Sequence, residues 1–188
     1  MATRKQFNYQ DKAQYYFIGG EGRPVVLLHG FGEDARVWEC CMHLSAEYKL
    51  IVPDLPGTGD SEPIEDAGME GLAACVHALI QLETGDGEPV ILLGHSMGGY
   101  IALAFAERHP ALLAGLGLVH STAFADGAEK RAARTKGIAF IEERGAFVFL
   151  KATIPNLYGS RTKEQTPEMV EEHIQKAQGF TDESLIAY

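Results

Sequence analysis

The residues with the clearest chemical potential are Gly94-His95-Ser96-Met97-Gly98, which match the pattern G-x-S-x-G. The apolar run 90–93 before them predicts a buried strand, and residues 100–108 after them predict a helix. So tight a turn strains the backbone of Ser96 and exposes its hydroxyl. The turn can form because the glycines on either side lack the β-carbons that would collide with the neighbouring strand and helix. The NH of Met97, at the start of the helix, would face negative charge on a carbonyl oxygen under attack. A glycine-rich turn with an incidental serine is the alternative interpretation.

Two further loops follow predicted buried strands. Residues 24–28 lead into His29-Gly30-Phe31-Gly32, and residues 49–53 lead into Asp54-Leu55-Pro56-Gly57-Thr58-Gly59-Asp60-Ser61. With the serine motif, these loops occur in the order found in the α/β-hydrolases, which the sequence resembles over essentially its whole length. The resemblance implies that Ser96 is the catalytic nucleophile and that the NH groups of Phe31 and Met97 form the oxyanion hole. It implies no metal and no organic cofactor.

Alternating buried strands and helices predict an α/β fold: a mostly parallel sheet with helices on both faces. An opening hairpin is expected over residues 6–18, a helix near residue 36, another from 69 to about 85, and a sixth strand at 115–120. Residues 1–121 are predicted to form the α/β-hydrolase core with strands one to six. Residues 122–188 are predicted to form a helical cap region, with the chain ending mid-element. Six apolar residues of this region are candidates to line a pocket, or simply hold the cap together: Phe140, Ile141, Phe147, Phe149, Leu150 and Tyr158.

The general base for the serine is not evident. In the family an acid follows the seventh strand and a histidine follows the eighth, and we expect both to lie beyond residue 188. His29 and His95 are expected to orient loops by hydrogen bonding rather than to transfer protons. After Ser96 the chain has three histidines, of which His109 is expected to end a helix, His173 to be solvated, and His120 to lie at the end of the sixth strand, pointing to the active edge of the sheet. A dyad of Ser96 with His120 is an alternative, with Asp126 either orienting it or serving as a helix N-cap or first-turn acid.

The last residues, 181–188, resemble the start of a helix. We therefore expect this sequence to be a fragment, incomplete before the seventh strand, and the 188-residue form to be inactive. The sixth strand would then be an uncovered, hydrophobic sheet edge carrying Leu116, Leu118 and Val119, with possible self-association through it.

The net charge of −10 disfavours nucleic acid and anionic membranes as partners. The sequence shows neither a signal-peptide core nor a run of membrane-spanning length, so a cytoplasmic location is expected. Three cysteines, Cys40, Cys41 and Cys75, lack metal-ligand or C-x-x-C spacing and are expected to be small packed residues.

The function predicted from this resemblance is a serine hydrolase acting on a small, largely apolar carboxylic ester or related acyl substrate. A cofactor-free haloperoxidase, a carbon-carbon bond hydrolase and an aminopeptidase are alternatives on the same scaffold. A non-catalytic protein, either ligand-binding or strand-exchanged, is the alternative from another class.

Overall fold

The computed structural model describes residues 2–85 and 87–188. They form two compact units: the first runs to Ala123 and also includes Tyr188, and the second is Phe124–Ala187. The sequence placed a boundary after residue 121, between a core and a cap. That the second unit acts as a cap stays a prediction.

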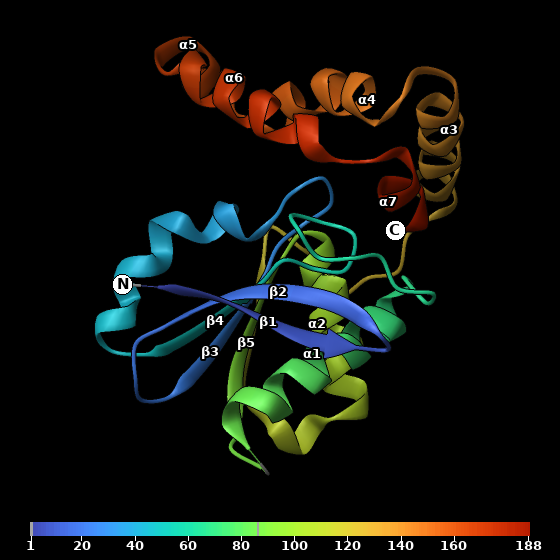
Figure 1. The fold of residues 1–188 in the computed structure, drawn as a ribbon. Helices are drawn as coiled ribbons and strands as arrows, with labels where there is room; N and C mark the ends of the chain where they lie inside the picture. Colours follow the sequence, from blue (N-terminus) through green and yellow to red (C-terminus); the bar gives the residue numbers. More distant parts are fainter. Residues whose placement is uncertain (1, 86) are drawn as a thin grey trace. The chain divides into compact units, whose positions relative to one another are not determined.

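One six-stranded sheet lies at the centre of the first unit, with the strand order β1-β2-β4-β3-β5-β6. Figure 1 labels its strands β1 to β5. β1 pairs antiparallel with β2, and β2 with β4, whereas β4, β3, β5 and β6 run parallel. The predicted α/β class with a mostly parallel sheet and an opening hairpin is confirmed. The strands are β1 Thr3–Tyr9, β2 Lys12–Gly19, β3 Pro24–Leu28, β4 Lys49–Pro53, β5 Val90–His95 and β6 Leu113–Val119.

Apolar side chains alternate between the two faces of the sheet, and each face packs against helical segments. On β3, Val26 and Leu28 belong to the larger core, which α1 and α2 complete. Val25 and Leu27 of the same strand belong to a second core with Trp38 of η1. This period of two places helical segments on both faces, as predicted. These segments are η1 Ala35–Ala46, α1 Met69–Thr84 and α2 Met97–Arg108, with a short η2 Pro110–Leu112 after them.

The structure defines where two helical segments begin. The segment that follows Asp34 is a 3-10 helix, and the Asp34 carboxylate caps it by accepting a hydrogen bond from the NH of Arg36 at 2.9 Å. α2 begins at Met97, directly after Ser96 as the motif predicts, and so includes residues 97–99 ahead of the run 100–108 that indicated the helix. Gly98 and Gly99 disfavour a helix by propensity, but close packing at this turn overrides that preference.

The sixth strand lies at the edge of the sheet. On its outward face Leu116 is 42% exposed and Leu118 is 36% exposed, while Val119 is half-buried and packs against the second core. An edge strand of this kind offers unpaired backbone groups. Self-association through it stays a prediction.

The second unit is helical in all its regular elements. Its buried apolar residues include Ile141, Leu150, Ile154 and Val170, and the Phe140 ring lies 6.1 Å from that of Phe149. The six predicted pocket residues are therefore partly packed against one another, and their lining of a pocket stays a prediction. The elements are α3 Ala128–Arg144, α4 Ala146–Thr153, η3 Ile154–Leu157, α5 Ser160–Gln165, α6 Pro167–Lys176, η4 Ala177–Gly179 and α7 Asp182–Ala187.

The cysteines differ in their surroundings. Cys75 is buried, as expected, and Cys41 is half-buried, but Cys40 is exposed on η1. The prediction that all three are packed was wrong for Cys40, because η1 covers the sheet with only part of its circumference. Among the described residues, no helix is both long and apolar enough to cross a membrane.

Candidate active site

Ser96 lies between β5 and α2 with a backbone φ of 50° and ψ of −113°, a combination that residues other than glycine rarely adopt. The neighbouring glycines explain how the turn closes. A β-carbon on Gly94 would lie 2.2 Å from the carbonyl oxygen of Gly98, and one on Gly98 would lie 2.6 Å from that of Leu28. The strained turn predicted from the motif is present, and Ser96 is half-buried rather than enclosed.

Backbone and side-chain hydrogen bonds hold this turn against β6. The NH of Ser96 donates to the carbonyl of Val119 at 2.9 Å, and the Ser121 hydroxyl donates to the carbonyl of Ser96 at 2.7 Å. Met97 is the first residue of α2, so its NH has no acceptor one turn earlier in the helix. Its side chain is buried in the larger core, which fixes the position of that NH.

The loop after β3 lies directly beside the serine. A β-carbon built on Gly30 would lie 3.1 Å from the Ser96 β-carbon. Phe31 follows Gly30, and its half-buried side chain packs against the larger core. Because β3 and β5 are adjacent and parallel, their carboxyl ends meet at one edge of the sheet. The structure thus brings Ser96, Phe31 and Met97 together, and their catalytic roles stay predictions.

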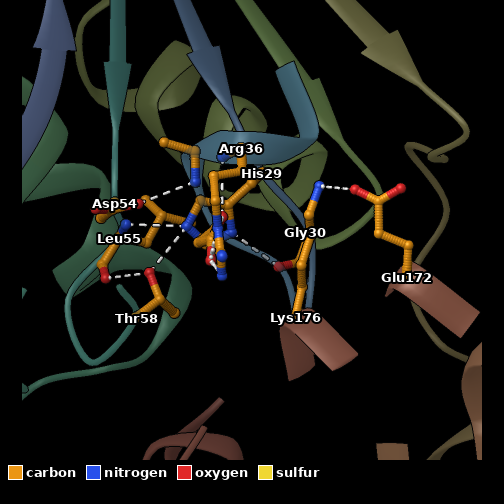
Figure 2. A network of polar contacts seen from close by, with 10 residues as sticks. His29, Gly30, Arg36, Asp54, Leu55, Thr58, Glu172 and Lys176 are labelled. Carbon is orange, nitrogen blue, oxygen red and sulfur yellow. Dashed lines mark hydrogen bonds and ion pairs between the residues drawn. The ribbon is translucent and has the colours of Figure 1, made fainter. Parts of the chain in front are cut away.

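His29 is fully buried and uses both ring nitrogens (Figure 2). The NH of Leu55 donates to Nε2 at 3.0 Å, so the ring proton is on Nδ1, which donates to the Gly30 carbonyl at 2.9 Å. Burial lowers the pKa of His29, which keeps the ring neutral. In a trans peptide the NH points opposite to the carbonyl, so fixing the Gly30 oxygen also fixes the direction of the Phe31 NH.

The loop after β4 contacts the Nε2 side of the His29 ring. The Thr58 hydroxyl donates to the Leu55 carbonyl at 2.7 Å and lies 3.0 Å from Nε2 of His29. Asp54 accepts a hydrogen bond from the NH of Ala35 at 2.9 Å, and burial raises the pKa of its carboxyl to about 6. This loop therefore holds the Gly30 loop in place, and the expectation that His29 orients loops by hydrogen bonding is confirmed.

Glu33 is a residue that the motif analysis missed. It is buried, and one oxygen, Oε2, accepts a hydrogen bond from the NH of Gly30 at 2.7 Å and another from Nδ1 of His95 at 2.7 Å. The hydrogen bond to Glu33 raises the pKa of His95. His95 thus orients the loop as expected, through a partner that could have been suspected because it is an acid directly after the His29-Gly30-Phe31-Gly32 motif.

His120 follows β6 and is exposed, with a backbone φ of 47°. Its ring lies 6.1 Å from that of His95, edge to face. The carboxylate of Asp126 pairs with Lys130 at 2.9 Å and with Arg134 at 2.5 Å, and the hydrogen bond from Arg134 chiefly lowers the pKa of Asp126 to about 2. The N-cap of α3 is Gly127, so the N-cap prediction for Asp126 was wrong by one residue.

The two other histidines after Ser96 have structural partners. His109 is the C-cap of α2, as expected for a helix-terminal residue, and its ring stacks on that of His77 at 3.8 Å. His173 is half-buried, and its Nδ1 forms a 2.9 Å hydrogen bond with the Tyr158 hydroxyl, so the prediction that it is merely solvated was wrong. Its position one turn from apolar residues on α6 explains the difference. Within residues 2–85 and 87–188, no group of three or more metal-ligating side chains could hold a metal ion.

A family model described as the alpha/beta hydrolase fold matches residues 23–138. The chain belongs to this family. A solved esterase from Thermogutta terrifontis is 30% identical, with a TM-score of 0.86, over 100% of this chain and 70% of its own. A solved hydrolase from Pseudomonas aeruginosa has a TM-score of 0.85 over 98% of this chain and 70% of its own, and at 18% identity it shows the fold alone.

Curated relatives of the α/β-hydrolase chain have several activities. A pimeloyl-[acyl-carrier protein] methyl ester esterase from Yersinia enterocolitica is 37% identical over 59% of this chain and 42% of its own length. An (E)-2-((N-methylformamido)methylene)succinate hydrolase from Acinetobacter baylyi is 34% identical over 55% of this chain and 39% of its own. The chain thus matches less than half of the length of these relatives.

Proposed function

We propose that this α/β-hydrolase is a serine hydrolase that cleaves a small, largely apolar carboxylic ester or related acyl substrate. The observation that carries the proposal is the strained, half-buried Ser96, with the Gly30 loop against it and the first turn of α2 directly after it. The esterases among the relatives support an ester rather than another substrate of the family.

In the proposed reaction, Ser96 Oγ forms a bond to the carbonyl carbon, and the serine proton passes to a general base. The carbonyl oxygen becomes an oxyanion, held by the NH groups of Phe31 and Met97. Each well-directed NH of this kind is worth about 3 to 4 kcal/mol to the transition state. The alkoxide then leaves with the proton from the base, and water hydrolyses the acyl-enzyme to the acid and free Ser96.

His29 is unsuited to act as this base, because both of its ring nitrogens are engaged. Its Nε2 accepts the NH of Leu55 and its Nδ1 donates to Gly30. The Nδ1 of His95 is bound to Glu33, which agrees with the loop-orienting role expected of that residue. We assign the roles of base and orienting acid to no residue of the described chain.

The proposal is tested with a fluorophosphonate probe and peptide mass spectrometry on the protein expressed from its complete reading frame. We expect the probe to label Ser96, and Ser96→Ala to abolish labelling and the hydrolysis of p-nitrophenyl acetate. Ser160→Ala, at the exposed start of α5, is the matched control and should label like the wild type. A folded wild type that neither labels nor hydrolyses esters would contradict the proposal and favour a non-catalytic ligand-binding protein.

The acyl specificity is tested with p-nitrophenyl esters of increasing chain length. We expect kcat/KM to be highest for short acyl chains, because the proposed substrate is small. A maximum at long acyl chains would contradict that part of the proposal while leaving the nucleophile assignment intact.

A further inference from the structure

Glu33 connects two segments that the proposed reaction needs at a fixed separation. We propose that Glu33 is a positioning residue, which joins the loop carrying Phe31 to the strand end carrying Ser96 and so sets the oxyanion donors against the nucleophile. This inference rests on the proposed function and adds to it a residue outside the recognised motifs.

The geometry of the contact supports this role. The Gly30 NH lies on the loop after β3 and the His95 ring lies at the end of β5, yet both donate to the same oxygen of Glu33, each at 2.7 Å. Hydrogen bonds to a carboxylate are about twice as strong as those between neutral groups. The Glu33 side chain is only 7% exposed, so water competes little for this oxygen.

The Gly30 segment is held from two directions, with different consequences. His29 fixes the carbonyl of Gly30, which sets the direction of the Phe31 NH. Glu33 fixes the NH of Gly30 and connects it to the residue before Ser96. Direction therefore depends on His29, whereas the distance between loop and nucleophile depends on Glu33.

The groups around Gly30 are closely packed. A β-carbon on Gly30 would lie 2.9 Å from Glu33 Oε2, 3.1 Å from the Ser96 β-carbon and 3.2 Å from His95 Nδ1. The three groups thus surround one point on the loop. Moving the carboxylate would move the loop relative to Ser96, and a displacement of about 1 Å at a reacting centre can cost about 100-fold in rate.

The charge of the contact matters as well as its shape. A buried carboxylate next to a developing oxyanion would destabilise it by like-charge repulsion unless it is paired. Nδ1 of His95 lies 2.7 Å from Glu33 Oε2, and the hydrogen bond between them raises the pKa of His95. The contact therefore favours a protonated His95 beside Glu33, which offsets the negative charge of the carboxylate.

The experiment compares Glu33→Ala and Glu33→Gln with Glu39→Gln, a control that removes an exposed carboxylate from the neighbouring η1. In the protein from the complete reading frame, we measure fluorophosphonate labelling and kcat and KM for p-nitrophenyl acetate. Glu33→Ala should lower kcat and the labelling rate by about 10- to 100-fold with KM changed less than about threefold. Glu33→Gln, whose amide oxygen still accepts from Gly30, should lose less, and Glu39→Gln should match the wild type.

Hydrogen exchange gives a second readout that does not depend on turnover. We expect the Gly30 amide to exchange at least about 10-fold faster in Glu33→Ala than in the wild type, with the melting temperature of Glu33→Gln nearly unchanged. If Glu33→Ala fails to fold, Glu33→Gln carries the test alone, and wild-type values of kcat and of the labelling rate in it would overturn the inference.

The outcomes separate this inference from the function on which it rests. If the wild type labels at Ser96 and both Glu33 variants label as fast as the wild type, the positioning role is overturned and the assignment as a serine hydrolase stands. A wild type that does not label overturns both.

Discussion

The hydroxyl of Ser121 donates a hydrogen bond of 2.7 Å to the backbone carbonyl of Ser96. Ser121 follows β6, so this bond connects the edge strand to the strained turn after β5. The same carbonyl accepts the NH of Gly99 at 3.0 Å, and the NH of Ser96 donates to Val119 at 2.9 Å. The unusual backbone of Ser96 is thus stabilised largely by groups on the neighbouring strand rather than by its own segment.

Ser121→Ala should therefore weaken the turn. We expect a loss of about 1 kcal/mol in the free energy of unfolding, the usual net worth of one hydrogen bond. Urea denaturation followed by tryptophan fluorescence measures the change, with Trp38 as the reporter in the second core. Ser160→Ala should be neutral within error, and an equal loss in both variants would show that the Ser121 bond contributes nothing specific.

Gly98→Ala should destabilise the fold considerably more. Its β-carbon would lie 2.6 Å from the Leu28 carbonyl oxygen and 2.7 Å from that of His29, and neither backbone group can move without disturbing β3. Overpacking of this kind costs typically about 1 to 3 kcal/mol. The same urea experiment checks it.

Gly115→Ala is the matched control for this change, because a β-carbon there would meet only the Ile91 side chain at 3.7 Å, an ordinary contact. Equal stability of the two variants would contradict the close approach at the turn.

Sequence motifs and side-chain periodicity were sufficient to predict the parts of the fold that depend on residues close together in the sequence. Alternating side chains on β3 and a glycine on each side of Ser96 specify the two-faced sheet and the tight turn, because the physical constraint acts within a few residues. The motif likewise placed the start of α2 directly after Ser96, and the structure begins it at Met97.

Contacts between distant residues could not be predicted in this way. Glu33 and His95 are 62 positions apart, and Tyr158 and His173 are 15 apart, so neither pair has a periodic signal. Only the topology, which places the loop after β3 beside the end of β5, brings Glu33 to His95. The same limit applies to Cys40, whose exposure depends on which part of η1 faces the sheet.

Asp54 should make stability depend on pH in an unusual direction. Burial raises the pKa of its carboxyl to about 6 from the ordinary value of 3.8, so the folded state binds the proton more tightly than the unfolded chain. Its contribution to stability is therefore complete below about pH 4 and is lost as the pH rises to about 6. The difference corresponds to about 3 kcal/mol.

Asp54→Asn tests this dependence, since its amide oxygen can still accept from Ala35. Unfolding free energies measured from pH 4 to 7 should fall less steeply in the variant than in the wild type. Asp11→Asn, which changes an exposed carboxylate, should leave the wild-type slope unchanged. Parallel curves for Asp54→Asn and the wild type would contradict a raised pKa at this site.

The tautomer of His29 governs the direction of the Phe31 NH, because Nδ1 contacts the Gly30 carbonyl. Because the NH of Leu55 occupies Nε2, the proton must be on Nδ1, and only this form can donate to the Gly30 carbonyl. Nitrogen-15 NMR of the ring should show a neutral Nδ1–H imidazole that does not titrate between about pH 8 and the ordinary histidine pKa of about 6.5. An Nε2–H form would leave the Leu55 NH without its acceptor and the Gly30 carbonyl without its donor, so the Phe31 NH would lose the constraint on its direction.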